Sequence, residues 1–305
     1  MNDSRNNSTE TWPPWGTKAA QKDPFMKIAY IVGLGRSGST LLDLMLNAHS
    51  QVCTVGEAKT LWSRAHVKKR MRWKPKGYYT HGSRCACGAE TIWHCPFWTR
   101  VNNALEKISG LSLTDLDIES SDLETFKLHN SYFFRAVQMA GNAQVVVDSS
   151  KGLTRLKKLL KIQEAQVFPI YLHRNPKGRA NSVRKNRNRV FSPTIQYSYN
   201  SFRLFLSLAF RYHVMLKYED LVDSPHEELQ RIMHFLDLHF ENSQMDWARF
   251  DSHNLAGNSM NRTKDSTLKL DASWRTELST MQKAIIELLA LPGNAINSAH
   301  KRLHN

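Results

Sequence analysis

The feature that most constrains this chain is a glycine-rich loop between a strand and a helix. Lys27–Val32 is a largely apolar run, typical of a strand buried on both faces of a parallel sheet. Thr40–Leu46 follows with the apolar spacing of a helix. The loop between them has glycines at positions 33, 35 and 38, which let a ligand approach the backbone closely. Its N–H groups and the positive end of the helix are suited to hold a phosphate or a sulfate.

Further apolar segments alternate with segments of helical periodicity. The other strand candidates are Gln51–Val55, Ala143–Val147, Gln166–Leu172 and Tyr212–Leu216. Such alternation predicts a parallel sheet that binds its ligands at the carboxyl ends of the strands. We therefore predict an α/β fold, a P-loop-like three-layer sandwich with a central parallel sheet of about five strands.

The rest of the chain divides around this sheet. Residues 1–24 are rich in Asn, Ser, Thr and Pro without hydrophobic period, which predicts a flexible leader before a single domain at 25–305. Between the second and third strands lies an insertion at about 58–140, for which we expect helices and a role as a lid or acceptor wall. Residues 220–250 indicate a helix pair, and 251–274 an ordered loop over the sheet edge.

The glycine loop departs from the Walker A motif of nucleotide triphosphatases. Gly33 and Gly38 have the Walker spacing, but Ser39 stands where the motif has its lysine, and Arg36 lies inside the loop instead. Val145–Asp148 has the pattern of a Walker B strand, which would hold Mg²⁺ in a kinase. The missing lysine argues against a P-loop kinase, which we keep as the alternative.

A second anion site is predicted where another strand ends. Arg174 follows the strand that ends at Leu172, and Ser182 comes eight residues after Arg174 on a helix that Pro176 helps to open. An arginine fork and a serine hydroxyl can together hold a phosphate. The alternative is an ordinary strand-to-helix turn with surface basic residues.

These two motifs, in this order, resemble the sulfotransferase superfamily that uses 3′-phosphoadenosine-5′-phosphosulfate (PAPS). The local match runs GLGRSGSTLLDLMLNAHSQVCTVGE and is similar to the tyrosylprotein and carbohydrate sulfotransferase branch, here as a soluble, bacterial-type member. The resemblance implies that PAPS, as co-substrate, is bound by Gly35, Arg36, Ser37, Gly38, Ser39, Thr40, Arg174, Ser182, Tyr218 and Arg262. Tyr218 would lie near the adenine and Arg262 near the 3′-phosphate. Their alternatives are a core-edge tyrosine and a surface arginine.

Sulfuryl transfer requires an in-line path, positive groups on the oxygens and a base for the acceptor proton, but no catalytic metal. Arg36 would neutralise charge on the leaving phosphate, and the resemblance places Lys151 within reach of the same oxygens. It also implies that Glu57 is the general base, although a salt-bridge role is the alternative. His49 and His173 are the other base candidates.

The insertion is strongly basic at its start. Between Ala58 and Ala89 there is no acidic residue, whereas Lys and Arg are frequent and alternate with Trp and Tyr. This pattern allows an anionic, glycan or aromatic acceptor, or single-stranded nucleic acid, and the alternative is a solvated basic helix. The whole chain has a net charge of +15, which favours anionic partners without choosing among them.

Three of the four cysteines lie close together in the same insertion. Cys85, Cys87, His94 and Cys95 offer three thiols and one imidazole, enough for a structural zinc site, and His81 is a further possible ligand. Because Cys-x-Cys is not the usual Cys-x₂-Cys spacing, a disulfide and ordinary packing are also open. Such a zinc would hold the lid together and take no part in transfer.

We expect a cytoplasmic protein. The first 25 residues lack the apolar stretch of a signal peptide, and there is no apolar run of about 18 residues that would span a membrane. The predicted function is transfer of the sulfuryl group of PAPS to a hydroxyl or an amine. A kinase and a basic nucleic-acid-binding protein are the alternatives, and no stable nucleic-acid partner is expected.

Overall fold

The fold is built on a five-stranded sheet whose strands all run parallel. The computed structural model describes residues 26–61, 85–187, 189–255, 260 and 264–304. The strand order is β2-β3-β1-β4-β5. The strands are β1 (Met26–Gly33), β2 (Val52–Thr54), β3 (Val145–Lys151), β4 (Ala165–His173) and β5 (Val214–Lys217). The predicted α/β sandwich is therefore confirmed, and each predicted strand overlaps an observed one.

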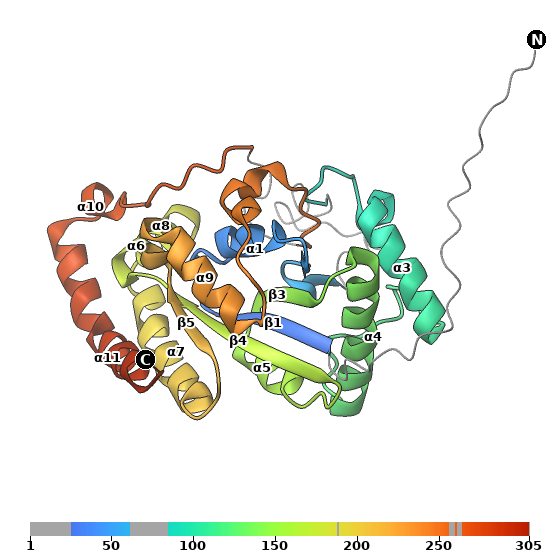
Figure 1. The fold of residues 1–305 in the computed structure, drawn as a ribbon. Coiled ribbons are helices and arrows are strands. Elements are labelled where there is room, and N and C mark those ends of the chain that lie inside the picture. The colour runs from blue at the N-terminus through green and yellow to red at the C-terminus, as the bar shows by residue number, and fades with distance from the viewer. Residues whose placement is uncertain (1–25, 62–84, 188, 256–259, 261–263, 305) are drawn as a thin grey trace, which may run out of the picture.

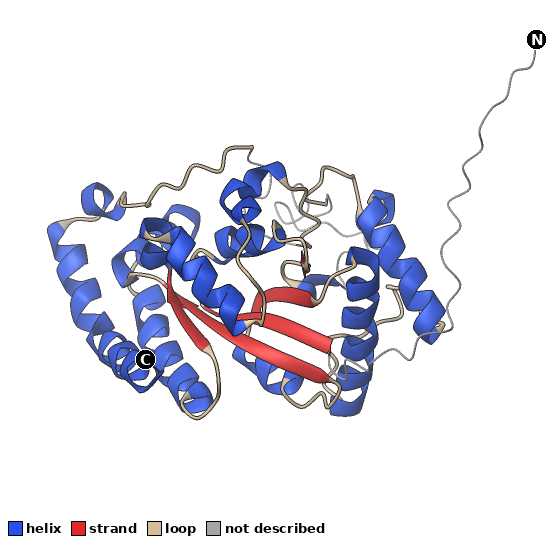
Figure 2. Ribbon diagram, in the orientation of Figure 1, coloured by secondary structure: helices blue, strands red, loops and turns tan. Residues whose placement is uncertain are grey.

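The sheet is buried because helices cover both of its faces (Figures 1 and 2). Ile28, Tyr30 and Val32 of β1 point into one apolar cluster, and Ala29 and Ile31 point into the other. Burial on both sides explains why β1 and β3 are nearly continuous apolar runs.

Four helical segments pack against the Ala29 face of the sheet. They are α1 (Ser39–Asn47), α8 (Tyr218–Asp223), α9 (Pro225–Phe235) and the 3₁₀ segment η3 (Asn242–Arg249). The opposite face is covered by α3 (Pro96–Ser109), α4 (Leu123–Gly141), α5 (Leu153–Leu159) and α7 (Ser192–Leu208). The remaining segments are η1 (Ala58–Thr60), η2 (Ile92–His94), α6 (Pro176–Arg187), α10 (Trp274–Glu277) and α11 (Thr280–His304).

In the described part of the insertion, α3 and α4 pack side by side at one side of the molecule (Figure 1). Asp122 caps α4 by accepting a hydrogen bond from the Thr125 N–H at 2.8 Å, and Asn142 ends the helix in a left-handed conformation. Several predicted features lie outside the described residues. They are most of the basic run, the leader at 1–24, His81 and Arg262.

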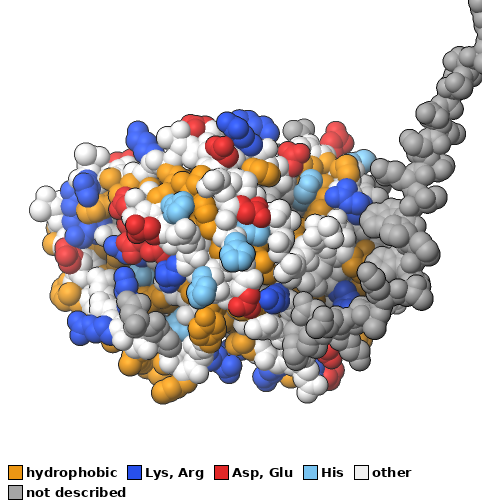
Figure 3. All heavy atoms as spheres, in the orientation of Figure 1, with side chains coloured by type: hydrophobic (Ala, Val, Ile, Leu, Met, Phe, Trp, Pro, Cys, Tyr) orange, Lys and Arg blue, Asp and Glu red, His pale blue; other side chains and the backbone are white. Residues whose placement is uncertain are grey.

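Where a helix pair was predicted at 220–250, the structure has three helical segments, α8, α9 and the 3₁₀ segment η3. On the face drawn in Figure 3, basic side chains are interspersed with acidic ones, so this face carries no single continuous basic patch among the coloured residues.

Among the described helices, none combines the length and the apolar character that a membrane crossing requires.

Candidate active site

The glycine loop connects β1 to α1 in a backbone conformation that requires glycine. Gly38 has φ 92°, and a Cβ atom there would lie 2.3 Å from Cδ2 of the Tyr218 ring. At Gly33, with φ 151°, a Cβ atom would lie 2.2 Å from the Leu172 carbonyl oxygen. Arg36 also has a positive φ of 71° although it is not glycine, and strain of this kind is concentrated at ligand-binding loops. The loop is therefore held in a defined shape directly before the N-terminus of α1, which is the positive end of the helix.

Two buried arginines that follow β4, Arg174 and Arg179, donate hydrogen bonds to backbone carbonyls of this loop. The Arg179 Nε donates to the Gly35 carbonyl at 3.1 Å, and Arg174 Nη1 donates to the Arg36 carbonyl at 3.4 Å. The other Arg179 nitrogens donate to the Pro193 carbonyl at 2.6 Å and to Gln196 Oε1 at 2.9 Å. Burial lowers the pKa of Arg179 to about 10, so the side chain is still a cation at neutral pH. The sequence pattern does not single out Arg179, because its contact with Gly35 joins residues that are 144 positions apart.

Arg174 has a buried guanidinium group, and one of its nitrogens lacks a hydrogen-bond partner among the described residues. Its Cζ lies 4.5 Å above the Tyr218 ring, and its Nη2 donates to Asp271 Oδ2 at 2.9 Å. Its Nε is buried and has no hydrogen-bond partner among the described residues. An unpaired buried donor is costly unless a ligand satisfies it, so Arg174 suits a phosphate. Ser182 lies further along α6, half-buried, on the same connection.

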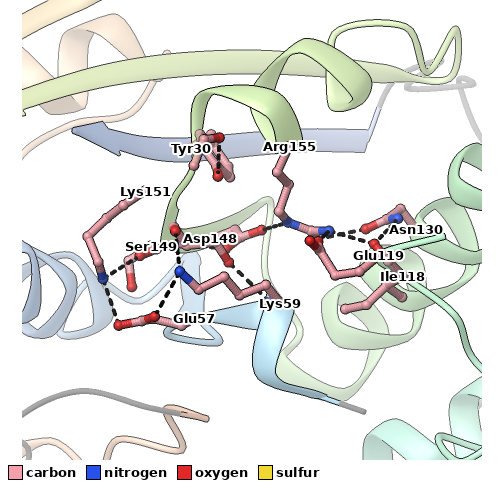
Figure 4. A network of polar contacts seen from close by, with 12 residues as sticks. Tyr30, Glu57, Lys59, Ile118, Glu119, Asn130, Asp148, Ser149, Lys151 and Arg155 are labelled. Atoms are coloured by element: carbon pink, nitrogen blue, oxygen red, sulfur yellow. Dashed lines mark hydrogen bonds and ion pairs between the residues drawn. The ribbon is translucent and has the colours of Figure 1, made fainter. Parts of the chain in front are cut away.

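Glu57 and Lys151 meet at the carboxyl ends of two neighbouring strands (Figure 4). Lys151 Nζ is 2.8 Å from Glu57 Oε1, and it also donates to the Ser149 carbonyl at 2.9 Å. Lys59 Nζ approaches the other carboxylate oxygen of Glu57 at 3.3 Å. The structure thus brings together two of the three predicted catalytic side chains.

The position of Lys151 depends on an irregularity in β3. Tyr30 is paired with Asp148 but Val32 with Lys151, so β3 has one extra residue opposite β1 at this point. Lys151 itself has a positive φ of 67°. Together the bulge and the left-handed residue turn the end of β3 so that the lysine reaches Glu57.

Comparison with known proteins gives this arrangement a family. The sequence profile described as Sulfotransferase family matches residues 29–242, well over half of the chain. This chain belongs to the sulfotransferase family. A search of curated proteins gave no significant match.

Two solved sulfotransferase structures are similar to the chain, and the first of them shares its fold. The sulfotransferase domain from the curacin biosynthetic pathway is 17% identical, with a TM-score of 0.50 over 88% of this chain and 98% of that one. The sulfotransferase domain from the Synechococcus PCC 7002 olefin synthase is 19% identical, with a TM-score of 0.49 over 87% of this chain and 94% of that one.

In this sulfotransferase Glu57 is a carboxylate at neutral pH. Burial by itself raises the pKa of Glu57, but the ion pair and hydrogen bond with Lys151, and then those with Lys59, outweigh burial and hold the pKa below its usual value. The side chain can therefore accept a proton over a wide pH range, but it is a weaker base than an unpaired glutamate.

Asp148, the residue of the Walker-like strand, is fully buried and already paired. Its Oδ2 accepts from Arg155 Nε at 2.8 Å, and its Oδ1 accepts from the Ser150 N–H at 2.9 Å. Arg155 continues the network to Asn130 Oδ1 at 2.8 Å and to Glu119 in the insertion (Figure 4). This carboxylate is therefore linked to the insertion through Arg155, and both of its oxygens are already occupied by protein donors.

Of the two histidines considered as bases, His49 holds local structure and His173 is a very weak proton acceptor because its pKa is low. The His49 Nε2 lies 2.8 Å from the His239 carbonyl, and its Nδ1 accepts from the Gln51 N–H at 3.0 Å, so both ring nitrogens hold local structure. Burial, and then the charge of Lys217, lower the pKa of His173 to about 3. Its ring is neutral at physiological pH, and neither histidine contacts Glu57 or Lys151 in the described structure.

The predicted thiol cluster exists, with one member corrected. Cys85, Cys87 and Cys95 lie together, but the imidazole beside them belongs to His253 and not to His94. His94 instead places its Nδ1 2.9 Å from Thr91 Oγ1 on an exposed turn. Because His253 is 158 residues from Cys95, no local spacing in the sequence could have identified it.

Proposed function

We propose that this sulfotransferase uses PAPS as its donor and sulfates a hydroxyl or an amine. PAPS supplies an activated sulfuryl group. The observation that carries the proposal is the contact between Glu57 and Lys151 at the ends of β2 and β3. This contact lies at the carboxyl-terminal end of the sheet, where β1 also leads into the glycine loop. Parallel sheets bind their ligands at this end of the strands.

Donor binding is assigned to the loop and to the residues after β4. The N–H groups of 35–40 and the start of α1 are suited to the 5′-phosphosulfate, with Arg36 as the cation inside the loop. Arg174 and Ser182 are assigned to the 3′-phosphate. The unpaired Nε of Arg174 supports this assignment, because a phosphate oxygen could accept the hydrogen bond that this nitrogen does not make in the protein. Tyr218, packed between Gly38 and Arg174, is assigned to the wall near the adenine.

We assign to Glu57 the role of the base that takes the proton from the hydroxyl or amine of the acceptor. Lys151 and Lys59 keep this carboxylate ionised in the free protein, so it is ready to accept a proton from an acceptor placed between it and the loop. Lys151 and Arg36 are the two cations that we assign to the negative charge on the transferring group and on the leaving phosphate. The insertion, which leaves the sheet directly after Glu57, is assigned to the acceptor.

The donor assignment is tested by thermal stabilisation with nucleotides. We expect 3′,5′-adenosine bisphosphate to raise the melting temperature more than ADP, which has the same number of phosphates but lacks the 3′-phosphate, and more than ATP with Mg²⁺. Arg174→Ala should remove most of the preference for the bisphosphate, with affinity about 10- to 100-fold weaker. Equal stabilisation by ADP, or stabilisation by ATP alone, would contradict PAPS as the donor.

The transfer reaction is tested with PAPS carrying labelled sulfate. Carbohydrate, tyrosine peptide, lipid and small-molecule acceptors are screened, and we expect label transfer to at least one class of hydroxyl or amine. Lack of any transfer by a protein that binds the bisphosphate would restrict the proposal to donor binding.

A further inference from the structure

The structure brings three cysteines and one histidine from distant parts of the chain into one cluster. Cys85 and Cys87 lie on a turn that is closed by a hydrogen bond from the Cys85 N–H to the Ala89 carbonyl at 2.8 Å. Cys95 immediately precedes α3, and His253 lies in the segment after η3. Their four ligand atoms all lie within 4.8 Å of one another. We propose that these four side chains bind one structural Zn²⁺.

The distances between the ligand atoms fit a tetrahedral zinc site. Zn–S bonds of about 2.3 Å require S–S separations of about 3.8 Å at tetrahedral angles. Cys95 Sγ lies 3.6 Å from Cys85 Sγ and 3.7 Å from Cys87 Sγ. His253 Nδ1 lies 3.2 Å from Cys95 Sγ and 3.9 Å from Cys85 Sγ. A disulfide would need sulfurs about 2.05 Å apart, and packing alone does not require an imidazole nitrogen at the same point.

The surroundings orient the histidine toward the sulfurs. The His253 ring stacks on Phe97 with a centroid distance of 4.8 Å and an interplanar angle of 10°. Its backbone carbonyl accepts from Trp98 Nε1 at 2.8 Å. Cys85 and Cys95 are buried, which shields the site from water. Three thiolates and one imidazole, with no position left open to a substrate, are typical of a structural zinc rather than a catalytic one.

The proposed zinc site would connect the insertion to the catalytic strands. Next to His253, Asn254 accepts from Thr54 Oγ1 of β2 at 2.9 Å and donates to the buried Asp43 of α1. The Leu255 N–H donates to the Val55 carbonyl at 3.0 Å, two residues before Glu57. A metal that joins His253 to α3 therefore also fixes the segment that supports Glu57.

The site is tested by comparing two histidine variants. Protein expressed with zinc and then desalted should contain about one zinc per chain by elemental mass spectrometry. His94→Asn, the matched control, should keep this zinc, whereas His253→Asn should bind it at least about tenfold more weakly in competition with a chromophoric chelator. Equal zinc affinity of both histidine variants in the chelator competition, or weaker binding by His94→Asn alone, would overturn the assignment of His253.

The wild-type protein provides a test that does not depend on the folding of a variant. After exchange of the metal for Co²⁺, we expect the visible absorption of a tetrahedral cobalt–thiolate site. A strong chelator should lower the melting temperature, and added zinc should restore it. A folded wild-type protein with no bound zinc, or an intact mass that reveals a disulfide between two of these cysteines, would overturn the proposal.

Discussion

The charge of Glu57 depends on two ammonium groups that reach it from different parts of the chain. Lys59 is two residues away in sequence, whereas Lys151 comes from the next strand of the sheet, 94 residues later. A glutamate as buried as this one would on its own have a raised pKa, so the lysines decide that it is ionised. The salt-bridge role and the base role foreseen for Glu57 are therefore compatible in one side chain.

Replacing the carboxylate tests its role as base. Glu57→Gln should reduce kcat by about 10²–10⁴-fold, because the amide cannot accept the acceptor proton, while affinity for 3′,5′-adenosine bisphosphate stays within about threefold. Glu119→Gln is the matched control, since Glu119 belongs to the same network but contacts Arg155. Wild-type turnover by Glu57→Gln would remove this residue from the mechanism.

The pH dependence of turnover tests the role of Lys151. Because the folded-state pKa of Glu57 is lowered, the carboxylate form that we propose as the base is present above that pKa and is lost only as the pH falls through it. Lys151→Met removes the largest cause that lowers this pKa and leaves burial, which raises it. We therefore expect the acid limb of the kcat profile to move to higher pH, whereas the exposed Lys157→Met should not move it. An unmoved acid limb in Lys151→Met would show that another group controls this part of the profile.

At the scale of elements, the strands were predictable and the fine placement of the site was not. Each of the five predicted strands overlaps an observed one because an apolar run is a local signal, although β3 continues four residues past the predicted end at Val147, through Asp148–Lys151. The bulge that turns Lys151 toward Glu57, the inward direction of Arg179 and the approach of His253 to Cys95 arise from tertiary packing. A pattern read along one segment does not contain that information.

The connection from β1 to α1 is an element whose backbone can be tested directly. Gly38→Ala should lower the free energy of unfolding by about 1–3 kcal/mol, because alanine disfavours φ 92° and its Cβ atom would collide with Tyr218. Gly35→Ala is the matched control in the same loop, since a Cβ atom at Gly35 meets nothing within 4 Å. Denaturant unfolding of both variants measures the difference. Equal stability would mean that the ring of Tyr218 moves aside without cost.

For the whole molecule, the buried side chain of Arg155 joins the sheet to the insertion, because it pairs with Asp148 of β3 and also donates to Glu119 and Asn130. Arg155→Met should destabilise the fold by about 3–5 kcal/mol, because it leaves the Asp148 carboxylate buried without its partner. Arg135→Met, an exposed arginine on α4, should change stability by less than about 0.5 kcal/mol in the same unfolding experiment. Similar stability of the two variants would show that the network is not needed to hold the insertion on the sheet.

The adjacency of β2 and β3 has a consequence for how such enzymes can diversify. The chain leaves the sheet just after Glu57 and returns by α4 to a strand that pairs with the one it left. Within that span, α3 and α4 pack on the sheet, so only the connections between packed helices can change length at little entropic cost, about 0.6 kcal/mol for each doubling of a loop. Segments of different length and sequence can therefore be exchanged at these connections in evolution, or grafted there by engineering, without disturbing Glu57 or the glycine loop.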